Sequence, residues 1–266
     1  MNYLLINGSA RRGNTWRVAE RLKEEIQALS PDAAFREIHL SDAGLPFCAG
    51  CSLCFREGGE RCPHRDAVQG VVGGIDWADG VVWATATYNM QPTALTKNLI
   101  DHLCFLLHRP RFFTKKAVAL TTVGGFGGKS AVKYLSGFLR GIGFNRCDSL
   151  CLASHSWNDY RIDEKAARKC AKLARSFQAE AASGWLRPPT LLQLIPYNLF
   201  RGMSLRYVAG SPYETADGAH WTEPARAARA YDPRVPLPFY KKLFGNAFYA
   251  LGKLGGRFVE VTYRKE

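Results

Sequence analysis

Short apolar runs alternate with longer amphipathic stretches along the first two thirds of the chain. The runs have the length of strands that are buried on both faces of a sheet, and we expect strands at 3–6, 34–40, 80–86, 117–122 and 147–152. The stretches between them carry apolar residues at helical spacing, which predicts helices over 15–29, 66–75, 92–107, 130–139 and 163–182. This alternation predicts an α/β fold, a doubly wound five-stranded parallel sheet with helices on both faces.

The loop after the first strand reads Asn-Gly-Ser-Ala-Arg-Arg-Gly-Asn-Thr, from residue 7 to residue 15. Backbone N–H groups at the start of the following helix point into such a loop, and the helix dipole favours an anion there. Ser9, Asn14 and Thr15 add side-chain donors, and Arg11 or Arg12 adds positive charge. We interpret the loop as a phosphate site; the alternative is an ordinary turn in which Asn14 or Thr15 caps the helix.

Two further loops follow strands of the predicted sheet, at 85–91 and at 122–128. Ligands of parallel α/β sheets bind beyond the carboxyl ends of the strands. Three loops with ligand-binding character at one edge therefore predict a pocket there. The glycine spacing of the first loop is not that of a dinucleotide fingerprint, and no Gly-Lys-Ser/Thr sequence ends it, so ATP and GTP are disfavoured.

Four of the eight cysteines lie close together, at Cys48, Cys51, Cys54 and Cys62. The Cys-x2-Cys-x2-Cys-x7-Cys spacing favours a 4Fe–4S cluster, because structural zinc more often uses two separated Cys-x2-Cys pairs. Free structural or redox-sensing thiols are the other alternative. The remaining four are interpreted as small buried hydrophobic residues: Cys104, Cys147, Cys151 and Cys170. The six histidines show no metal-binding spacing, and only His64 lies near a clustered cysteine.

The composition is that of a folded protein, with 47% apolar and 22% charged residues among 266. The formal net charge is +13, but lysine and arginine are spread along the chain and no nucleic-acid motif is visible, so nucleic-acid binding is not expected. No apolar run approaches the ~18 residues of a membrane span, and no signal peptide is visible at the N-terminus. We expect a cytoplasmic protein.

Residues 1–183 resemble the flavodoxin-like NAD(P)H-dependent FMN reductases and, within them, the iron–sulfur flavoproteins. The first loop matches the family pattern Gly-Ser-x-Arg followed by Asn-Thr. The third strand ends in Thr85-Ala86-Thr87-Tyr88-Asn89, where the family has Ser/Thr-Pro-x-Tyr, and Lys97 and Asp101 match the helix that follows. Ala86 replaces the usual proline and His102 the usual arginine.

The resemblance implies strand order 2-1-3-4-5, FMN as cofactor and NAD(P)H as substrate. It assigns the first loop to the FMN phosphate and the other two loops to the flavin ring. The implied FMN-binding residues are Gly8, Ser9, Arg11, Asn14, Thr15, Thr85, Thr87, Tyr88, Asn89, Met90, Thr122, Gly124 and Gly125. The implied cluster ligands are the four clustered cysteines, in a Cys-rich loop over 41–65. Hydride transfer to a flavin needs no protein acid or base, so no catalytic side chain is expected.

Residues 184–266 form a C-terminal extension of different character. An apolar segment over 191–207 precedes a polar, turn-rich segment over 211–236. An amphipathic helix is predicted over 238–258, with Tyr240, Leu243, Leu251 and Leu254 among the residues on its apolar side. We expect this helix to pack on its own domain or on a partner subunit of a homo-oligomer, in preference to a membrane surface.

Three functional hypotheses follow. The leading one is an FMN-dependent NAD(P)H oxidoreductase that reduces a small acceptor such as a quinone or a nitroaromatic. The second is an iron–sulfur flavoprotein that exchanges electrons with a ferredoxin-type partner, which the basic charge mildly favours. The third is a redox-sensing or metal-binding protein without flavin.

Overall fold

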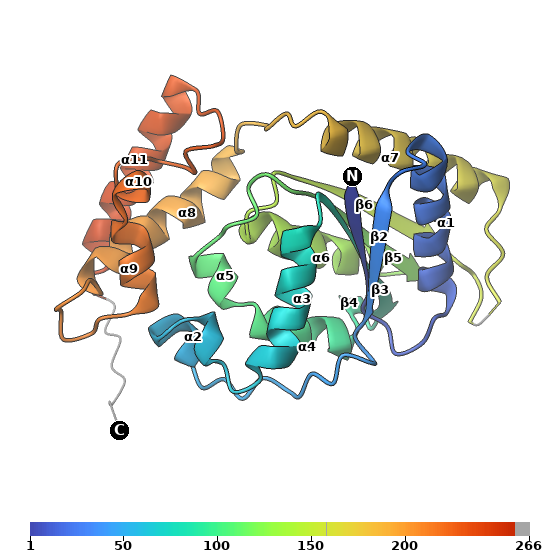
Figure 1. Ribbon diagram of the computed structural model, residues 1–266, viewed down its shortest axis with the longest axis horizontal. Coiled ribbons are helices and arrows are strands. Elements are labelled where there is room, and N and C mark those ends of the chain that lie inside the picture. Colours follow the sequence, from blue (N-terminus) through green and yellow to red (C-terminus); the bar gives the residue numbers. More distant parts are fainter. Residues whose placement is uncertain (158, 259–266) are drawn as a thin grey trace.

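A parallel sheet runs through the larger part of the protein, with helices on both of its faces (Figure 1). The computed structural model describes residues 1–157 and 159–258. Its strands are β1 (Asn2–Asn7), β2 (Ala34–His39), β3 (Gly80–Tyr88), β4 (Gln91–Pro92), β5 (Lys116–Val123) and β6 (Arg146–Ala153). The parallel strands are ordered β2-β1-β3-β5-β6, and β4 is a two-residue strand antiparallel to β3. The predicted order 2-1-3-4-5 is therefore confirmed, because β5 and β6 are the predicted fourth and fifth strands.

The helices between the strands cover both faces of the sheet. They are α1 (Asn14–Leu29), α2 (Leu53–Arg56), the 3-10 turn η1 (Gly59–Arg61), α3 (Arg65–Trp77), α4 (Ala94–His102), α5 (Phe105–His108), α6 (Gly128–Gly141) and α7 (Glu164–Ala182). The single helix predicted over 92–107 is wrong, since the chain turns between α4 and α5. The turn brings Phe105 into the core beside Leu103 and Leu106, although Phe105 would lie off the buried side of a straight helix.

Each face of the sheet has its own apolar core. Side chains of α1 and α7, such as Trp16 and Phe177, pack with Tyr3 and Leu5 of β1 on one face. Side chains of α3, α4 and α6 pack on the other face against the alternate residues of the same strands. Because successive strand residues point to opposite faces, the strands contribute side chains to both cores. This packing holds the strands in register and fixes the positions of their ends.

The extension is a group of helices at one end of the molecule (Figure 1). It comprises α8 (Leu191–Met203), the 3-10 turn η2 (Ser204–Arg206), α9 (Ala216–Thr222), α10 (Pro224–Ala227) and α11 (Phe239–Gly255). Tyr197, Trp221 and Tyr231 of the extension enclose Phe113, which lies just before β5. The Trp221 indole N–H also donates to the His108 carbonyl oxygen at 2.9 Å. The extension therefore packs on the sheet domain of its own chain.

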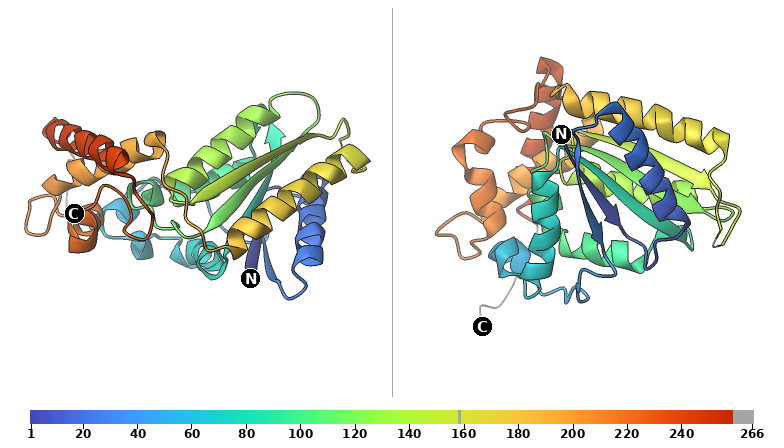
Figure 2. Two further views of the ribbon diagram at one scale, coloured as in Figure 1. Left: turned by 90° about the horizontal axis from the view of Figure 1, so that it is seen from above. Right: turned by 45° about the vertical axis from the view of Figure 1, so that its right-hand side comes forward.

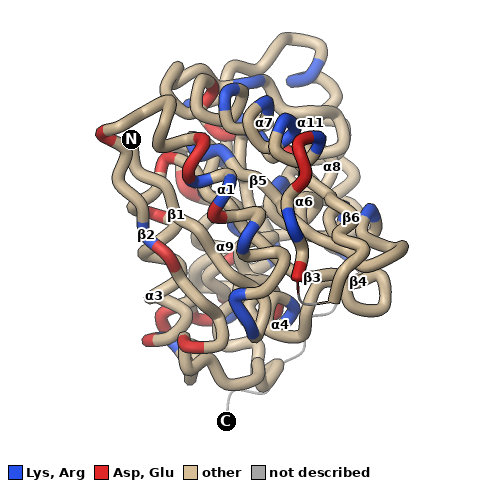
Figure 3. The backbone as a smooth tube through the Cα atoms, turned by 90° about the vertical axis from the view of Figure 1, so that its right-hand side faces the viewer, with Lys and Arg blue, Asp and Glu red and all other residues tan. Residues whose placement is uncertain are grey.

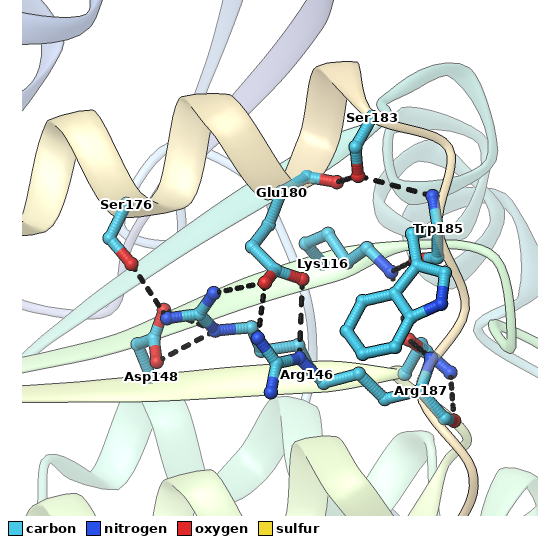
Figure 4. A network of polar contacts seen from close by, with 9 residues as sticks. Lys116, Arg146, Asp148, Ser176, Glu180, Ser183, Trp185 and Arg187 are labelled. Atoms are coloured by element: carbon cyan, nitrogen blue, oxygen red, sulfur yellow. Dashed lines mark hydrogen bonds and ion pairs between the residues drawn. The ribbon is translucent and has the colours of Figure 1, made fainter.

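The connection from α7 to the extension is held by a polar network at the N-terminal end of β5 (Figure 4). The buried Lys116 ammonium donates to the Asn145 side chain at 2.8 Å and to the Trp185 carbonyl oxygen at 2.7 Å. Glu180, near the end of α7, pairs with Arg146 of β6 and with Arg187. The hydrogen bond from Arg187 is the main cause that lowers the pKa of Glu180. These contacts fix where the extension leaves the domain.

Helix α11 packs on α8 through glycines rather than through its large apolar residues. A Cβ atom on Gly252 would lie 2.4 Å from the Leu199 carbonyl oxygen, and one on Gly202 would lie 2.4 Å from the Tyr249 carbonyl oxygen. The two backbones are thus too close for any side chain between them. The predicted apolar side of α11 faces largely outward instead, with Tyr240, Leu243, Leu251 and Leu254 more than half exposed.

Lysine and arginine are distributed over many elements (Figure 3), in line with their even spread along the sequence. Among the residues that the structure describes, no helix has both the length and the apolar character needed to cross a bilayer.

Candidate active site

The loops at the carboxyl ends of β1, β3, β5 and β6 enclose a cavity of about 720 Å³, here called the strand-end cavity. This volume lies in the range typical of cofactor sites. Nine of the thirteen predicted FMN-binding residues line it: Ser9, Arg11, Asn14, Thr15, Thr87, Tyr88, Asn89, Thr122 and Gly124. The topology therefore brings the three predicted loops together around one space.

The other four predicted residues do not line the cavity. Gly8 and Thr85 lie beneath its floor, where the Gly8 carbonyl oxygen accepts from Thr93 and Thr96. A Cβ atom on Gly8 would collide with the Thr96 hydroxyl, so this glycine serves close packing between β1 and α4. Met90 packs against Gly127. Gly125 lies in the third loop outside the residues that line the cavity.

The first loop is held in shape by its own side chains. The Ser9 backbone N–H donates to the Asn7 side chain at 3.1 Å, and the Ser9 hydroxyl accepts from the Ala86 N–H at 3.1 Å. Among the described residues, no side chain caps the N-terminus of α1, where Gly13 occupies the N-cap position. The backbone N–H groups of its first turn therefore remain free to bind an anion in the cavity, with Arg11 beside them.

Hydroxyl pairs join the loops to one another. The Thr15 and Thr122 hydroxyls are 2.6 Å apart, and those of Thr87 and Thr121 are 2.8 Å apart. The Asn14 side chain, which also lines the cavity, donates to the Ser156 carbonyl oxygen at 2.9 Å. Its amide thus positions the loop after β6, and one N–H is no longer available for a ligand.

The loop after β6 contributes Ser154, Ser156 and Trp157 to the cavity, and the sequence interpretation missed all three. Trp157 is 93% exposed on the rim. The rule that ligands bind at the carboxyl ends of parallel strands applied equally to the predicted fifth strand. The position of this loop after a strand was therefore the signal that could have identified its residues, although the loop lacks glycine and any family motif.

The turn between β3 and β4 has an unusual backbone. Its two central residues, Asn89 and Met90, both have positive φ angles, of 49° and 64°. Two-residue hairpin turns of this kind usually carry Asn-Gly, because glycine adopts positive φ without strain. Met90 therefore holds a conformation that is costly for its type, and it does so at the edge of the cavity, where Tyr88 is half exposed.

The clustered cysteines lie around a second cavity of about 60 Å³, here called the cysteine pocket. Its lining includes all four of them together with His64, Asp101, His102 and Cys104. Two of these residues correct the sequence interpretation. Cys104 is half-buried in this pocket rather than part of an apolar core, and His102 lies beside Cys62. Cys147 and Cys170 are buried, as expected, whereas Cys151 is only partly buried at the edge of a core.

Helix α4 shapes the backbone of the Cys-rich loop. Asn98 accepts from the Cys48 N–H at 3.0 Å and donates to the Pro46 carbonyl oxygen at 2.9 Å. His102 is buried and its Nε2 lies 2.9 Å from the same carbonyl oxygen, while its Nδ1 lies 3.9 Å from Cys62 Sγ. Because Thr93 and Thr96 of the same segment contact the first loop, α4 connects the cysteine pocket with the strand-end cavity.

The extension reaches the cysteine pocket through Arg109. This guanidinium donates to the Cys54 and Phe55 carbonyl oxygens and pairs with Asp217 of α9. The pKa of Cys54 is lowered to about 7, mainly by a hydrogen bond with Cys104 and in part by the charge of Arg109. The pKa of Cys62 is raised, mainly by burial. Of Cys54 and Cys62, Cys54 is therefore the more readily ionised to the thiolate, which is the form that binds metals.

Cys62, His64 and His102 also place one donor atom each within 4.8 Å of one another. Thiolate and imidazole donors suit iron and zinc. The cysteine pocket therefore carries the donor chemistry of a metal site. Lys97 and Asp101, the two residues of α4 that match the family pattern, form an ion pair on the helix surface.

Comparisons with known proteins agree with this geometry. The family model for NADPH-dependent FMN reductases matches residues 1–159. An iron–sulfur flavoprotein of Clostridioides difficile (strain 630) is 30% identical over 175 residues, which cover 65% of this chain and 76% of that protein. An iron–sulfur flavoprotein of Archaeoglobus fulgidus is 37% identical over 101 residues, which cover 38% of this chain and 48% of the relative.

Solved structures share the fold at lower identity. A flavone reductase superposes with a TM-score of 0.54 at 13% identity, covering 68% of this chain and 63% of its own. An NAD(P)H:quinone oxidoreductase from Methanothermobacter marburgensis superposes with a TM-score of 0.51 at 17% identity, covering 66% of this chain and 94% of its own. These similarities concern the sheet and its helices.

Proposed function

The chain belongs to the family of NADPH-dependent FMN reductases, and from this premise we propose that its strand-end cavity holds FMN and serves reduction of a small acceptor such as a quinone or a nitroaromatic. As a member of this family, the protein is an FMN-dependent NAD(P)H oxidoreductase. The acceptor and the assignment of residues to parts of the cofactor are the proposed part.

The observation that carries the assignment is the uncapped N-terminus of α1 at the strand-end cavity. Its free N–H groups, the Arg11 guanidinium and the Ser9 and Thr15 hydroxyls suit a phosphate. We assign them to the phosphate of FMN. The Thr15–Thr122 contact then keeps this end of the cavity at a fixed distance from the third loop.

Tyr88, Asn89 and Gly124 line the same cavity and are assigned to the flavin ring. Bound FMN supplies the chemistry that accepts a hydride from the nicotinamide and passes electrons on. The residues of this chain orient the ring and leave one side open, since Tyr88 is half exposed and Trp157 stands at the rim. None of these residues has to act as an acid or a base for that role.

Purified protein tests this proposal directly. We expect bound flavin in the visible spectrum, and oxidation of NADH or NADPH that speeds up on addition of a quinone or a nitroaromatic. A Thr15→Ala, Thr122→Ala double variant should bind FMN less tightly than the wild type. A Thr222→Ala variant in the extension should bind FMN as tightly as the wild type. A colourless wild-type protein that takes up no added FMN would contradict the proposal and favour the flavin-free alternative.

We also propose that Cys48, Cys51, Cys54 and Cys62 hold a 4Fe–4S cluster. Support comes from their common pocket, from the low pKa of Cys54 and from the compact spacing. When bound, such a cluster exchanges single electrons. The contacts of Asn98 and Arg109 with the loop backbone would hold the cysteines in place.

Metal analysis distinguishes the possible occupants. Protein purified without oxygen should contain iron and acid-labile sulfide in equal amounts, and show broad absorption near ~400 nm that bleaches with dithionite. Cys54→Ser should remove this absorption, and Cys170→Ser, which changes a buried cysteine in a different core, should retain it. Zinc without sulfide, or no metal after anaerobic reconstitution with iron and sulfide, would contradict the cluster.

A ferredoxin-type electron donor or acceptor is the second candidate partner. Cys48 and Cys51 are exposed, so one edge of the cysteine pocket is open to a docking protein. The net charge of +13 suits an acidic carrier. Reduction by a reduced ferredoxin should then slow as ionic strength rises, because salt screens the attraction. A rate that is independent of salt would argue for the small acceptor alone.

A further inference from the structure

The outward face of α11 is an apolar surface to which the preceding assignments give no function. Its members, here called the outer face, are five residues of α11 and one just beyond its end, each more than half exposed: Phe239, Tyr240, Leu243, Leu251, Leu254 and Phe258. Leu192 of the neighbouring α8 is 78% exposed. Contiguous exposed apolar surface on this scale marks a contact with another body rather than with water.

The orientation of α11 is fixed by contacts that do not involve the outer face. Gly245, Gly252 and Gly256 turn toward α8 and its surroundings, where a Cβ atom would meet Asn198, Leu199 or Met203. Rotating the helix to bury its large residues would require side chains in a space that only glycine fits. The apolar residues therefore stay exposed. The helix itself lies at the end of the molecule away from the sheet (Figure 2).

Positive charge borders the outer face, and α8 and α11 contain no acidic residue. A hollow of about 760 Å³ lies where the two helices end, with Leu205, Ala250 and Leu254 between Arg206, Lys253 and Arg257. Among the residues that the structure describes, no ion pair neutralises these three cations. The site thus combines an apolar floor with a cationic rim.

We propose that the outer face and this hollow dock the protein on the surface of an anionic lipid bilayer. In this arrangement α11 lies in the plane of the interface, with its leucines and aromatic rings among the upper acyl chains. Arg206, Lys253 and Arg257 contact lipid phosphates, and Lys241 and Lys242 add attraction at the other end of the helix. The helix has 17 residues and one face is committed to α8, so it lies on the bilayer rather than across it.

Charge also argues against a second copy of the chain as the occupant. A symmetric contact through the outer face would bring the lysines of α11 close to the same lysines of the other copy. Neither α8 nor α11 offers a carboxylate to compensate. An anionic bilayer instead supplies many negative charges together with an apolar phase, which matches both parts of the surface.

Sedimentation of the full-length holoprotein with vesicles tests the proposal. We expect binding to vesicles of phosphatidylcholine mixed with phosphatidylglycerol, little binding to phosphatidylcholine alone, and release at high salt. Lys253→Glu with Arg257→Glu should weaken binding at least about tenfold. The matched control is Lys169→Glu with Lys172→Glu, which makes the same charge change on exposed positions of α7 and should have a smaller effect.

The apolar contribution has its own variant. Leu251→Asn with Leu254→Asn changes only exposed side chains, so circular dichroism and the flavin spectrum should be unchanged while vesicle binding falls. Leu29→Asn, at an exposed leucine on α1, is the control. Equal binding to both vesicle types, no binding to either, or a dimer that Leu251→Asn dissociates in light scattering would overturn the proposal.

Discussion

The phosphate end of the strand-end cavity depends on one charged side chain among neutral donors. Arg11 lines the cavity, whereas Arg12 beside it does not. Hydrogen bonds to charged groups contribute roughly 1.5–3 kcal/mol. We therefore expect Arg11→Ala to raise the dissociation constant of FMN about tenfold or more, measured by the quenching of flavin fluorescence.

Riboflavin, which lacks the phosphate, provides the control for Arg11. Its affinity should be the same for the wild type and for Arg11→Ala, and Arg12→Ala should leave both ligands unaffected. An equal loss of affinity for FMN and riboflavin would show that Arg11 acts on the ring or on the fold, and would contradict the assignment of the first loop.

Glu180 makes stability depend on pH through its contacts with Arg187 and Arg146. Its pKa is lowered in the folded state, so its ionised form stabilises the fold above the unfolded-state pKa of about 4.3. That contribution is lost as the pH falls through the lower folded-state value. Glu180→Gln should therefore reduce the loss of unfolding free energy between neutral and acid pH in urea titrations.

A matched substitution on the same helix isolates this effect. Glu164, at the first turn of α7, pairs with Arg168 while its side chain is 90% exposed. Exposed pairs of this kind contribute little, so Glu164→Gln should leave the pH profile close to that of the wild type. Identical profiles for all three proteins would show that Glu180 has the same pKa in both states.

Among the elements, α9 is connected to the Cys-rich loop by the Arg109–Asp217 pair. Both side chains are nearly buried, and Arg109 also donates to the Cys54 and Phe55 carbonyl oxygens. Removing one partner of a buried pair leaves an uncompensated charge. We expect Asp217→Asn to lower the free energy of unfolding by about 3 kcal/mol and, in protein that carries the proposed cluster, to speed metal loss to a chelator.

The control for Asp217→Asn is Asp66→Asn, which removes a pair with Arg65 whose side chains are mostly exposed. It should change stability by less than about 0.5 kcal/mol. If Asp217→Asn is destabilising but metal loss is unchanged, α9 supports the fold without holding the Cys-rich loop.

The α8–α11 contact makes a prediction of its own. Gly252→Ala places a methyl group against the Leu199 backbone, which cannot move as a flexible side chain can. We expect a loss of at least about 2 kcal/mol in unfolding free energy. Gly137→Ala in α6, where nothing lies within 4 Å of the added carbon, should instead stabilise by about 0.5–1 kcal/mol. A tolerated Gly252→Ala would show that the two helices separate easily.

For the whole molecule, the extension completes a core that begins in the sheet domain. Phe113 is 2% exposed and is enclosed by extension residues, and Lys116 donates to the Trp185 carbonyl oxygen. A chain that ends at residue 183 should expose both and aggregate or unfold at lower temperature than the full chain. A truncated chain with the same melting temperature, measured by circular dichroism, would show that the extension is a separate unit.

The sequence predicted site residues correctly where a recognisable loop motif directly follows a clear strand. The first loop and the Tyr88 segment follow strands whose apolar runs are clear, and both line the strand-end cavity. Trp157 and Ser156 follow a strand as well, but their loop has no glycine or motif. Cys104 lies in the turn between α4 and α5, and His102 reaches the cysteine pocket from the last turn of α4; neither position follows from a sequence motif.

Which face of α11 is buried could also not be predicted from the sequence, because it depends on contacts between distant segments. Periodicity identified Leu243, Leu251 and Leu254 as one side of the helix, and burial of that side was the natural expectation. The choice depended instead on Gly202 of α8, which allows Gly252 and its neighbours to approach so closely that the glycine side is favoured. Such complementarity between two segments does not appear in either one alone.

The link from Arg109 to Asp217 also sets an order of events during synthesis. The Cys-rich loop and Arg109 leave the ribosome long before α9, which at roughly 5–20 residues per second follows seconds later. In that interval Arg109 lacks its carboxylate partner, so the Cys-rich loop is held without the support of the extension. Arrival of Asp217 then supplies the partner of Arg109, so the support of the Cys-rich loop is complete only after α9 has been synthesised.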